Sequence, residues 1–271
     1  MNRDMDNTVG VIKRRYNIGL ALSGGGVKGF AHAGALKALE EYNIKPDIIS
    51  GTSAGAVVAV LYSAGYSPDE ICDLFYNKDF NDFVELNIPK CGFFGTAGFI
   101  TFLKKHINYE LIEELPIPVR IVATDLDNGR SITFSEGELH KRVMASACVP
   151  IVFTPVDIDG TKYVDGGIFK NFPVSVIRDE CEFVIGVNAS PLVTEKYKKN
   201  IVGIAERSYH FMFRANTIED KKLCDILVET DSVMQFKTFD LKQVKVIFNT
   251  GYEEMKRALE LKSFNLERQK Q

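Results

Sequence analysis

The chain contains 271 residues, of which 45% are hydrophobic and 25% charged, and it carries a formal net charge of −3. This composition is ordinary for a globular protein, and the length suffices for one large α/β domain with a full hydrophobic core. The net charge is negative and no basic stripe extends beyond Lys13-Arg14-Arg15, so we expect no nucleic-acid partner.

The amino-terminal segment and the cysteines favour a cytoplasmic protein. Residues 1–15 include Asp4 and Asp6 and have no apolar core, so we expect a flexible arm and no secretory signal. No run of about 18 apolar residues is present to span a bilayer. The five cysteines are widely spaced, which predicts free thiols in a reducing compartment. No carboxylate cluster has calcium-ligand spacing, and we expect neither a metal nor a cofactor.

The first predicted strand–helix unit contains a glycine cluster. Residues 17–23 form a short, mostly apolar run typical of a buried strand, and residues 30–41 repeat apolar side chains at helical spacing. The sequence Gly24-Gly25-Gly26-Val27-Lys28-Gly29 lies between them. Backbone N–H groups at the start of a helix point outward without partners, so this position favours an anion.

Three kinds of anion site share this glycine pattern. A dinucleotide site needs an acidic residue at the end of the second strand, about 20 residues further on, but Asp47 stands at the start of the next strand candidate. A Walker phosphate loop needs Ser or Thr after Lys28, where this chain has Gly29. An oxyanion hole for the tetrahedral intermediate of acyl transfer remains.

The second strand–helix unit contains the sequence Gly51-Thr52-Ser53-Ala54-Gly55. It lies between the short apolar run 47–49 and the helix-like run 54–64. A Gly-x-Ser-x-Gly turn from a strand into a helix pushes its serine out at the end of the sheet, where the serine acts as a nucleophile. Ser53 is therefore the candidate nucleophile, and an ordinary Gly/Ser-rich loop is the alternative.

Residues 66–118 are the least regular part of the chain and the richest in aromatic side chains. One interpretation is a helical subdomain whose rings pack on the sheet. The other is a helical cap whose apolar inner face binds an acyl chain and excludes water. In the second interpretation Phe93 and Phe94, flanked by Gly92 and Gly95, are substrate-binding residues.

A serine nucleophile needs a base. The chain has four histidines: His32, His106, His140 and His210. None of them follows a strand end, and the charged segments around His106 and His140 predict solvated helix faces. Asp165 is the better candidate, because it ends a predicted hairpin with an Asp159-Gly160 turn and precedes two glycines that permit close approach. His32 is the first alternative, and an ordinary acidic turn at Asp165 is another.

The remaining segments complete an α/β pattern. Further strands are expected at 119–124 and 183–189, an amphipathic helix within 196–223, and a C-terminal helix at 241–261. This alternation predicts a three-layer α/β/α fold with a mainly parallel central sheet, built as one domain over residues 16–271. On such sheets ligands bind beyond the carboxyl ends of the strands, where Ser53 and the glycine cluster both fall.

Three motifs together resemble those of the patatin-like lipid acyl hydrolases, of the single-domain bacterial type. They are Gly-Gly-Gly-x-Lys-Gly at 24–29, Gly-x-Ser-x-Gly at 51–55 and Asp-Gly-Gly at 165–167. Segments 122–126, 145–150 and 171–174 are similar to the family as well. The resemblance covers about residues 18–191 and implies a patatin-like fold.

The resemblance implies a Ser–Asp dyad in which no histidine takes part. Ser53 is then the nucleophile, Asp165 the base, and the amides of Gly24, Gly25 and Gly26 form the oxyanion hole. Lys28 stands where the family has Arg or Lys, and it is expected to support the glycine loop electrostatically or structurally. A carboxylate is a weak base, so burial should raise the pKa of Asp165.

The function predicted in this way is a serine esterase or phospholipase that hydrolyses lipid carboxylic esters through an acyl-enzyme. An acyltransferase using the same acyl-serine is the alternative, although residues 56–60 lack the Arg expected beside the elbow of malonyl transferases. An inactive scaffold is less favoured, because Ser53, Asp165 and the glycine loop are all intact. The expected partner is a lipid ester, with transient membrane-surface contact through apolar side chains.

Overall fold

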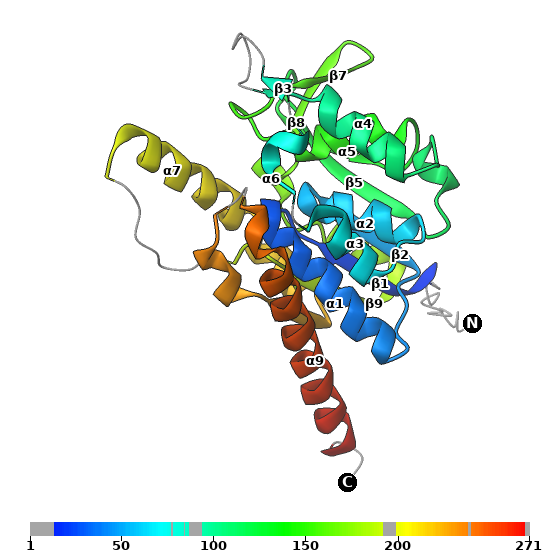
Figure 1. Cartoon of the computed structure of the whole chain (residues 1–271). Coiled ribbons are helices and arrows are strands. Elements are labelled where there is room, and N and C mark those ends of the chain that lie inside the picture. The colour runs from blue at the N-terminus through cyan, green and yellow to red at the C-terminus, as the bar shows by residue number, and fades with distance from the viewer. Residues whose placement is uncertain are drawn as a thin grey trace, which may run out of the picture.

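The computed structural model describes residues 14–76, 78–83, 85–86, 94–191, 199–237 and 240–268 (Figure 1). Within these residues the chain forms one eight-stranded sheet and one two-stranded sheet. The strands of the large sheet are β1 (Tyr16–Leu22), β2 (Ile48–Thr52), β5 (Val119–Asp125), β6 (Arg130–Phe134), β7 (Val156–Ile158), β8 (Thr161–Asp165), β9 (Cys181–Asn188) and β10 (Ile226–Glu229).

The strand order is β10-β9-β1-β2-β5-β8-β7, and β6 also pairs with β5. Strands β10, β9, β1, β2 and β5 are parallel to one another, whereas β6, β8 and β7 join by antiparallel pairing. Every residue of β2 is buried, as expected for a strand covered on both faces. The predicted α/β fold with a mainly parallel sheet is confirmed.

Strand β5 has two successive neighbours along one edge. Strand β2 pairs with its first part, ending at Thr52 opposite Val122. Strand β8 pairs with its last part, with Asp165 opposite Ala123. Because β6 occupies the other edge over residues 121–125, β8 continues the edge at the point where β2 stops.

The hairpin that carries β8 turns at Asp159 and Gly160, which have φ angles of 52° and 86°. Two successive positive φ values match the twist of the flanking strands, and Asp-Gly is a favoured pair for this turn. The predicted hairpin is therefore present.

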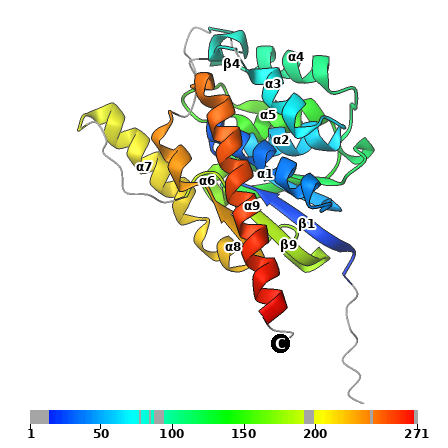
Figure 2. The ribbon, with the colours of Figure 1, turned by 60° about the horizontal axis from the view of Figure 1, so that its bottom comes forward.

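Helices cover both faces of the sheet. The larger layer consists of α1 (Phe30–Glu41), α2 (Ala54–Ser63), α3 (Pro68–Phe75) and α9 (Val244–Arg268), and α9 crosses the strands beside α1 (Figure 2). This helical layer packs on alternate residues of the strands, such as Leu20, Leu22 and Ile49.

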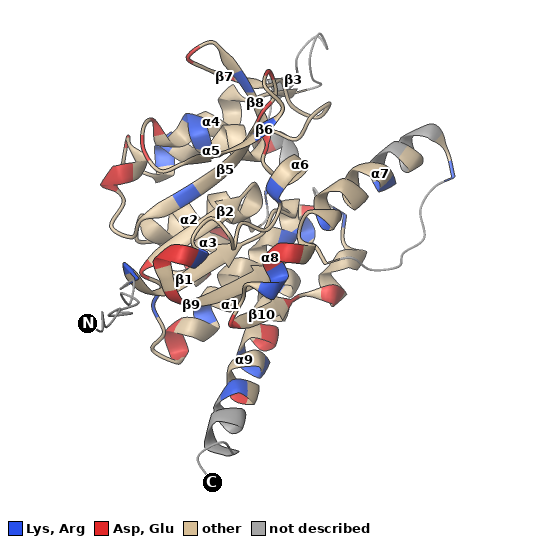
Figure 3. Ribbon diagram, turned by 180° about the vertical axis from the view of Figure 1, so that it is seen from behind, with Lys and Arg blue, Asp and Glu red and all other residues tan. Residues whose placement is uncertain are grey.

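The opposite face of the sheet is covered by a thinner layer, in which α8 (Ile218–Lys222) lies over the strands when the molecule is seen from behind (Figure 3). Ala21, Ile48 and Val184 pack there against Phe172, Val174 and Ile177. The two faces thus use the alternating side chains of the same strands, as a sheet between two helical layers requires.

The segment 66–118 lies at one end of the sheet. It contains α3, a turn of 3-10 helix at Phe80–Phe83, the paired strands β3 (Glu85–Leu86) and β4 (Phe94–Gly95), and α4 (Ala97–His106). The rings of Phe75, Phe83 and Phe102 contact one another with centroids 4.9–5.4 Å apart, and Phe75 also contacts Phe30 of α1 at 5.0 Å. The aromatic cluster therefore packs on the helical layer at Phe30, and Phe99 also packs against a cluster that includes Ala123 of β5 and Val156 of β7.

Of the predicted N-terminal arm, residues 1–13 lie outside the described residues. Arg14 donates hydrogen bonds to the carbonyl oxygens of Cys181 and Glu182, at 2.8 and 3.2 Å. Helix α7 (Ile201–Ala215) projects from the body at its N-terminal end, and its C-terminal end meets the sheet beside the short helix α6 (Gly167–Lys170) (Figure 1).

Candidate active site

Ser53 occupies a strained backbone turn between β2 and α2. Its φ and ψ angles are 53° and −121°, a conformation rare for residues other than glycine. Side chains at Gly51 and Gly55 would overlap neighbouring backbone, at the Ala56 nitrogen and the Leu22 carbonyl oxygen respectively. These constraints are those of a strand–turn–helix elbow that presents a serine at the end of a sheet.

The edge shared on β5 brings Asp165 to this serine. Thr52 ends its strand opposite Val122, and Asp165 ends its strand opposite the next residue, Ala123. Ser53 Oγ donates a hydrogen bond to Asp165 Oδ2 at 2.6 Å, between residues 112 positions apart in the chain. Both side chains are buried, with exposed fractions of 6% and 0%.

Backbone and side-chain hydrogen bonds hold Asp165 in place. Gly167 N–H donates to Asp165 Oδ1 at 2.8 Å, so each carboxylate oxygen accepts one bond. The backbone N–H of Asp165 donates to the Cys148 carbonyl at 2.8 Å, and Thr124 Oγ1 donates to the Asp165 carbonyl at 2.9 Å. The carboxylate therefore has a fixed orientation toward Ser53.

Ser146 holds the elbow from the side of α5 (Leu139–Ala147). Its hydroxyl accepts a hydrogen bond from Ser53 N–H at 2.8 Å and donates one to the Val122 carbonyl at 2.6 Å. This anchoring role was not predicted from the sequence, which gave no sign that a helical serine would reach the N–H of Ser53.

Burial raises the pKa of Asp165 from 3.8 to about 6, and the hydrogen bonds from Ser53 and Gly167 oppose this rise. The ionised carboxyl is less favourable in a dry site than in water, so its affinity for a proton increases. A carboxylate with this pKa is a stronger base than an exposed aspartate and remains mostly ionised at neutral pH.

No described contact joins Ser53 to a histidine. His32, the first alternative, is fully buried, its Nε2 lies 2.7 Å from the Ser23 carbonyl oxygen, and burial lowers its pKa to about 4. His140 is also fully buried, with Nε2 3.1 Å from the Ile107 carbonyl oxygen. The solvated helix face predicted for His140 is therefore wrong: the ring closes a polar contact between α5 and the segment after α4.

The glycine loop presents unoccupied N–H groups near Ser53. Gly24 N–H already donates to the Asn171 carbonyl at 2.9 Å, so it is not available to an oxyanion. Among the described residues, no hydrogen bond occupies the N–H of Gly25 or of Gly26, where a turn of 3-10 helix begins. Lys28 lies within that turn and is buried, with 5% exposed. Of the three glycine N–H groups predicted to form an oxyanion hole, that of Gly24 is occupied, and those of Gly25 and Gly26 have no described partner.

The side chain of Asn171 borders both the glycine loop and the acid. A side chain added at Gly24 would overlap Asn171 Oδ1 and approach Ser53 Cβ to 3.3 Å. One added at Gly167 would lie 2.8 Å from Asn171 Oδ1 and 3.0 Å from Asp165 Oδ1. Asn171 is fully buried, and its side-chain amide has no hydrogen-bond partner. This amide fills the space that the two glycines leave open.

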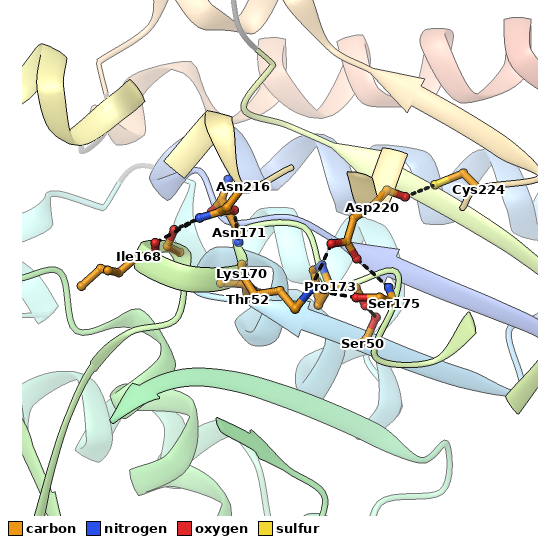
Figure 4. Close-up of polar contacts among 11 residues, drawn as sticks. Ser50, Thr52, Ile168, Lys170, Asn171, Pro173, Ser175, Asn216, Asp220 and Cys224 are labelled. Carbon is orange, nitrogen blue, oxygen red and sulfur yellow. Dashed lines mark hydrogen bonds and ion pairs between the residues drawn. The ribbon is translucent and has the colours of Figure 1, made fainter. Parts of the chain in front are cut away.

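The segment after Asp165 is held by polar contacts with three other parts of the chain: Asn216 just after α7, Asp220 of α8, and strand β2 (Figure 4). Asn216 Oδ1 accepts from Asn171 N–H at 2.8 Å, and Asp220 accepts from Ser175 N–H and from Lys170 Nζ at 2.6 and 3.0 Å. From β2, Thr52 Oγ1 donates to the Lys170 carbonyl and Ser50 Oγ to the Pro173 carbonyl, each at 2.8 Å.

An apolar cavity of about 140 Å³ adjoins Ser53. Its lining is almost entirely hydrophobic. It comes from the glycine loop, the start of α1, the Ser53 turn with α2, the segment 66–118, α5 with the residues after it, and the turn before α9: Gly26, Val27, Gly29, Phe30, Ser53, Ala54, Val57, Val58, Phe75, Phe83, Phe99, Met144, Ala147, Val149, Phe153 and Leu241. The predicted substrate-binding residue Phe94 is not in this lining. It packs against Phe153, with centroids 6.4 Å apart, and Phe93 lies outside the described residues.

The described residues contain neither a metal-binding cluster nor a helix that could span a membrane. That part of the chain contains no group of three or more side chains arranged to hold a metal ion. It also contains no helix long and apolar enough to cross a bilayer. Cys72, Cys148, Cys181 and Cys224 are free thiols, and Cys91 lies outside the described residues.

Comparison with known proteins finds a family whose model matches the part of the chain that contains both Ser53 and Asp165. The model of a family described as patatin-like phospholipase matches residues 20–177. An uncharacterised NTE family protein of Mycobacterium tuberculosis is 34% identical over 175 residues, covering 64% of this chain and 46% of that protein. The chain thus spans about half the length of this relative.

Two further relatives differ in how much of their length is matched. An uncharacterised protein of Acanthamoeba polyphaga mimivirus is 28% identical over 276 residues, covering 89% of this chain and 93% of that protein. Patatin-like phospholipase domain-containing protein 7 of Rattus norvegicus is 32% identical over 169 residues, covering 59% of this chain and 12% of that protein. Among solved structures, VipD from Legionella pneumophila overlaps 92% of this chain and 67% of its own, with a TM-score of 0.49 and 15% identity.

Proposed function

Because the chain belongs to the patatin-like phospholipase family, we propose that it hydrolyses lipid carboxylic esters with Ser53 as the nucleophile and Asp165 as its base. The observation that carries this proposal is the 2.6 Å hydrogen bond from Ser53 Oγ to Asp165 Oδ2. A base within hydrogen-bond distance of a hydroxyl can accept its proton and so activate it as a nucleophile.

In the first half of the reaction Asp165 accepts the proton of Ser53 Oγ as this oxygen attacks the ester carbonyl. The carbonyl oxygen becomes negatively charged and accepts hydrogen bonds from Gly25 and Gly26 N–H. The tetrahedral intermediate then collapses, Asp165 returns the proton to the departing alcohol, and the acyl group remains on Ser53.

In the second half a water molecule takes the place of the alcohol. Asp165 accepts a proton from the water, which attacks the acyl carbonyl, and the same two N–H groups stabilise the second oxyanion. The proton passes from Asp165 to Ser53 Oγ as the carboxylic acid leaves. One carboxylate thus serves as base and then acid in each half.

The apolar cavity beside Ser53 is the proposed site of the acyl chain. Its volume of about 140 Å³ is close to that of an engineered protein cavity that holds one benzene molecule, which corresponds to about six carbon atoms. Phe75, Phe83 and Phe99 reach this cavity from the segment 66–118, which supports the interpretation of that segment as a cap over the acyl group.

A covalent probe and two point variants test this function. Ser53→Ala and Asp165→Asn should each lower kcat for an ester substrate by at least about 10³-fold, as losses of a nucleophile or its base do. A fluorophosphonate should label the wild type at Ser53 and leave Ser53→Ala unlabelled. The exposed Ser135→Ala serves as the matched control and should label normally. Labelling at another serine, or full activity in Ser53→Ala, would contradict the proposal.

Hydrolysis and acyl transfer are separated by their products. Both use the same acyl-serine, and the cavity and the pair of N–H donors serve either reaction. We expect the free acid to dominate when the enzyme acts on an ester in water containing an added alcohol. An acylated alcohol as the main product would favour the acyltransferase instead, and no product at all would favour an inactive scaffold.

Helix α7 is the proposed point of contact with a lipid surface. Ile204, Phe211 and Met212 are 53%, 48% and 47% exposed, although all three are large and apolar. Their spacing places them on one side of the helix, and α7 projects from the body (Figure 3). An esterase for lipids must reach its substrate at such a surface, and an apolar helix face adjoining the site provides the contact.

A further inference from the structure

The C-terminal half of α7 is fastened to the turn that follows Asp165. Asn216, just beyond the helix, donates from Nδ2 to the carbonyl oxygens of Gly167 and Ile168, at 2.8 and 3.1 Å (Figure 4). Within the helix, the ring of Phe213 lies 3.0 Å from the point where a side chain at Gly167 would begin. Gly167 is the residue whose N–H holds the Asp165 carboxylate, so this end of α7 has a fixed position beside the acid.

Tyr209 lies one helical turn before Phe213 and on the same side of α7. The two rings contact each other with centroids 4.3 Å apart. The hydroxyl of Tyr209 is buried, yet it has no hydrogen-bond partner. By contrast, the hydroxyl of Tyr62 donates to Glu40 at 3.0 Å and that of Tyr66 to the His106 carbonyl at 2.8 Å.

A buried hydroxyl without a partner costs free energy and calls for an explanation. Burial raises the pKa of the Tyr209 phenol, and the negative charges of Asp165 and Cys148 raise it further. The hydroxyl consequently keeps its proton at every physiological pH. It is a neutral, buried donor without a partner, and its ring lies on the side of α7 where Phe213 packs at Gly167.

The proposed reaction places the two halves of an ester on different sides of Ser53. The apolar cavity is lined by the glycine loop, the start of α1, α2, α5 with Val149 and Phe153 after it, the segment 66–118 and Leu241, and no described residue of α7 is in its lining. Asp165 must deliver its proton to the departing alcohol, so the alcohol half lies on the side of Asp165. That is the side to which α7 is fastened.

We propose that the Tyr209 hydroxyl donates a hydrogen bond to the alcohol half of the ester, which makes α7 the determinant of selectivity for a polar alcohol such as glycerol. This inference rests on the proposed function, because the assignment of sides depends on Ser53 and Asp165 acting as described. The acceptor is an oxygen of the alcohol half other than the ester oxygen. An alcohol without such an oxygen leaves the phenol unpaired.

The variant Tyr209→Phe tests this proposal, because it keeps the ring against Phe213 and removes only the hydroxyl. Two substrates with the same acyl chain are compared, monohexanoylglycerol and ethyl hexanoate. The ratio of kcat/KM for the glycerol ester to that for the ethyl ester should fall about 5- to 10-fold, the loss of one neutral hydrogen bond. The variant should melt no lower than the wild type, since an unpartnered buried hydroxyl is removed. An unaltered ratio would overturn the proposal.

Tyr66→Phe is the matched control. Its hydroxyl is bonded within the protein, so this variant should lose stability and keep the wild-type ratio of the two esters. Ser53→Ala distinguishes a failure of the role proposed for Tyr209 from a failure of the proposed function. If Ser53→Ala is inactive and Tyr209→Phe keeps the wild-type ratio, only the role of Tyr209 fails. If Ser53→Ala retains activity, the proposed function fails, and the role of Tyr209 falls with it.

Discussion

At the scale of single residues, Asp165 combines a chemical role with an unfavourable position for a charge. It is fully buried and has a pKa of about 6. The proposed base is active only when it is ionised. We therefore expect kcat/KM for a neutral ester to rise with pH through about 6 and to reach a plateau above it.

The expected size of this effect follows from the pKa. At pH 5 about one tenth of Asp165 is ionised, so kcat/KM should be about ten-fold below its plateau value. A pH profile with a substrate that does not titrate, such as ethyl hexanoate, measures this directly. A plateau that extends below pH 4.5 would show that Asp165 is not the base.

The same carboxylate should lower the stability of the fold at neutral pH. Between pH 3.8 and about 6 the folded state binds more protons than the unfolded chain, so the free energy of unfolding falls as pH rises and stays lower above pH 6. Asp165→Asn removes this charge. At pH 8 we expect it to raise the free energy of unfolding by about 3 kcal/mol, or Tm by roughly 6–12 °C.

Thermal unfolding at two pH values distinguishes this effect from a change in packing. At pH 4, below the folded pKa, the wild-type carboxyl is mostly neutral and the variant should gain little. An equal gain at pH 4 and pH 8 would show that the charge of Asp165 is not the cause.

Gly24 tests how closely the glycine loop, Asn171 and Ser53 fit together. In Gly24→Ala the new methyl group would overlap Asn171 Oδ1 and press on Ser53 Cβ. We expect kcat to fall about 10²-fold, comparable with the loss of one oxyanion donor. In a double-mutant cycle, Asn171→Ala should restore part of this loss because it removes the overlap. A strictly additive cycle would contradict the packing described here.

Residues that act through sequence motifs could be predicted, whereas those that act through tertiary contacts could not. Ser53 and Asp165 belong to short glycine-rich motifs, and the structure brings them into contact. Ser146 and Tyr209 lie on ordinary helical segments, and their importance depends on which backbone N–H or which acid they face. Phe94 was selected for its flanking glycines, but it packs behind Phe153.

At the scale of elements, the long apolar strands were predicted and the short peripheral ones were missed. Strand β6 is half-exposed, and β10 has four residues at the edge of the sheet. Strand β6 alternates polar and apolar residues, and the apolar run of β10 is only three residues long, Ile226 to Val228. The Asn128-Gly129 pair before β6 is a hairpin signal that the sequence did contain.

The outer side of helix α7 is the proposed contact with lipid, and its apolar side chains Phe211 and Met212 are about half exposed. Replacing both Phe211 and Met212 by serine removes apolar surface from its outer side and should weaken binding to phosphatidylcholine vesicles about ten-fold. Co-sedimentation with vesicles measures the change. Val246→Ser on α9, which alters a residue 51% exposed elsewhere on the surface, is the control. Equal loss in the control would mean that α7 is not the contact.

At the scale of the whole molecule, the cavity is enclosed jointly by the body and by the segment 66–118. Its size should therefore set the preferred acyl length. Phe99→Ala removes a ring from the cavity wall, and we expect the preferred chain to lengthen by about two to four carbons. Rates across a series of p-nitrophenyl esters measure this shift.

Phe94→Ala is the informative comparison for that series. Its ring is outside the cavity lining, so the preferred length should remain that of the wild type. If Phe94→Ala shifts the preference and Phe99→Ala does not, the substrate-binding role predicted for Phe94 from the sequence is restored, and the cavity is not the acyl site.

The overall architecture could be predicted because α/β alternation and three motifs agreed on it. The register of the strands could not, since a one-residue slip leaves the apolar pattern of a fully buried strand nearly unchanged. Yet that register decides the site. Thr52 and Asp165 sit opposite the adjacent residues Val122 and Ala123.

Strand β5 therefore determines the distance between Ser53 and Asp165. The two reactive groups come from distant parts of the chain and approach from opposite directions, but their separation is measured along a single strand. Loops joining the elements can grow or shrink during evolution without altering that separation. One residue inserted between Val122 and Ala123 would slide the acid away from the alcohol, although every reactive residue would still be present in the sequence.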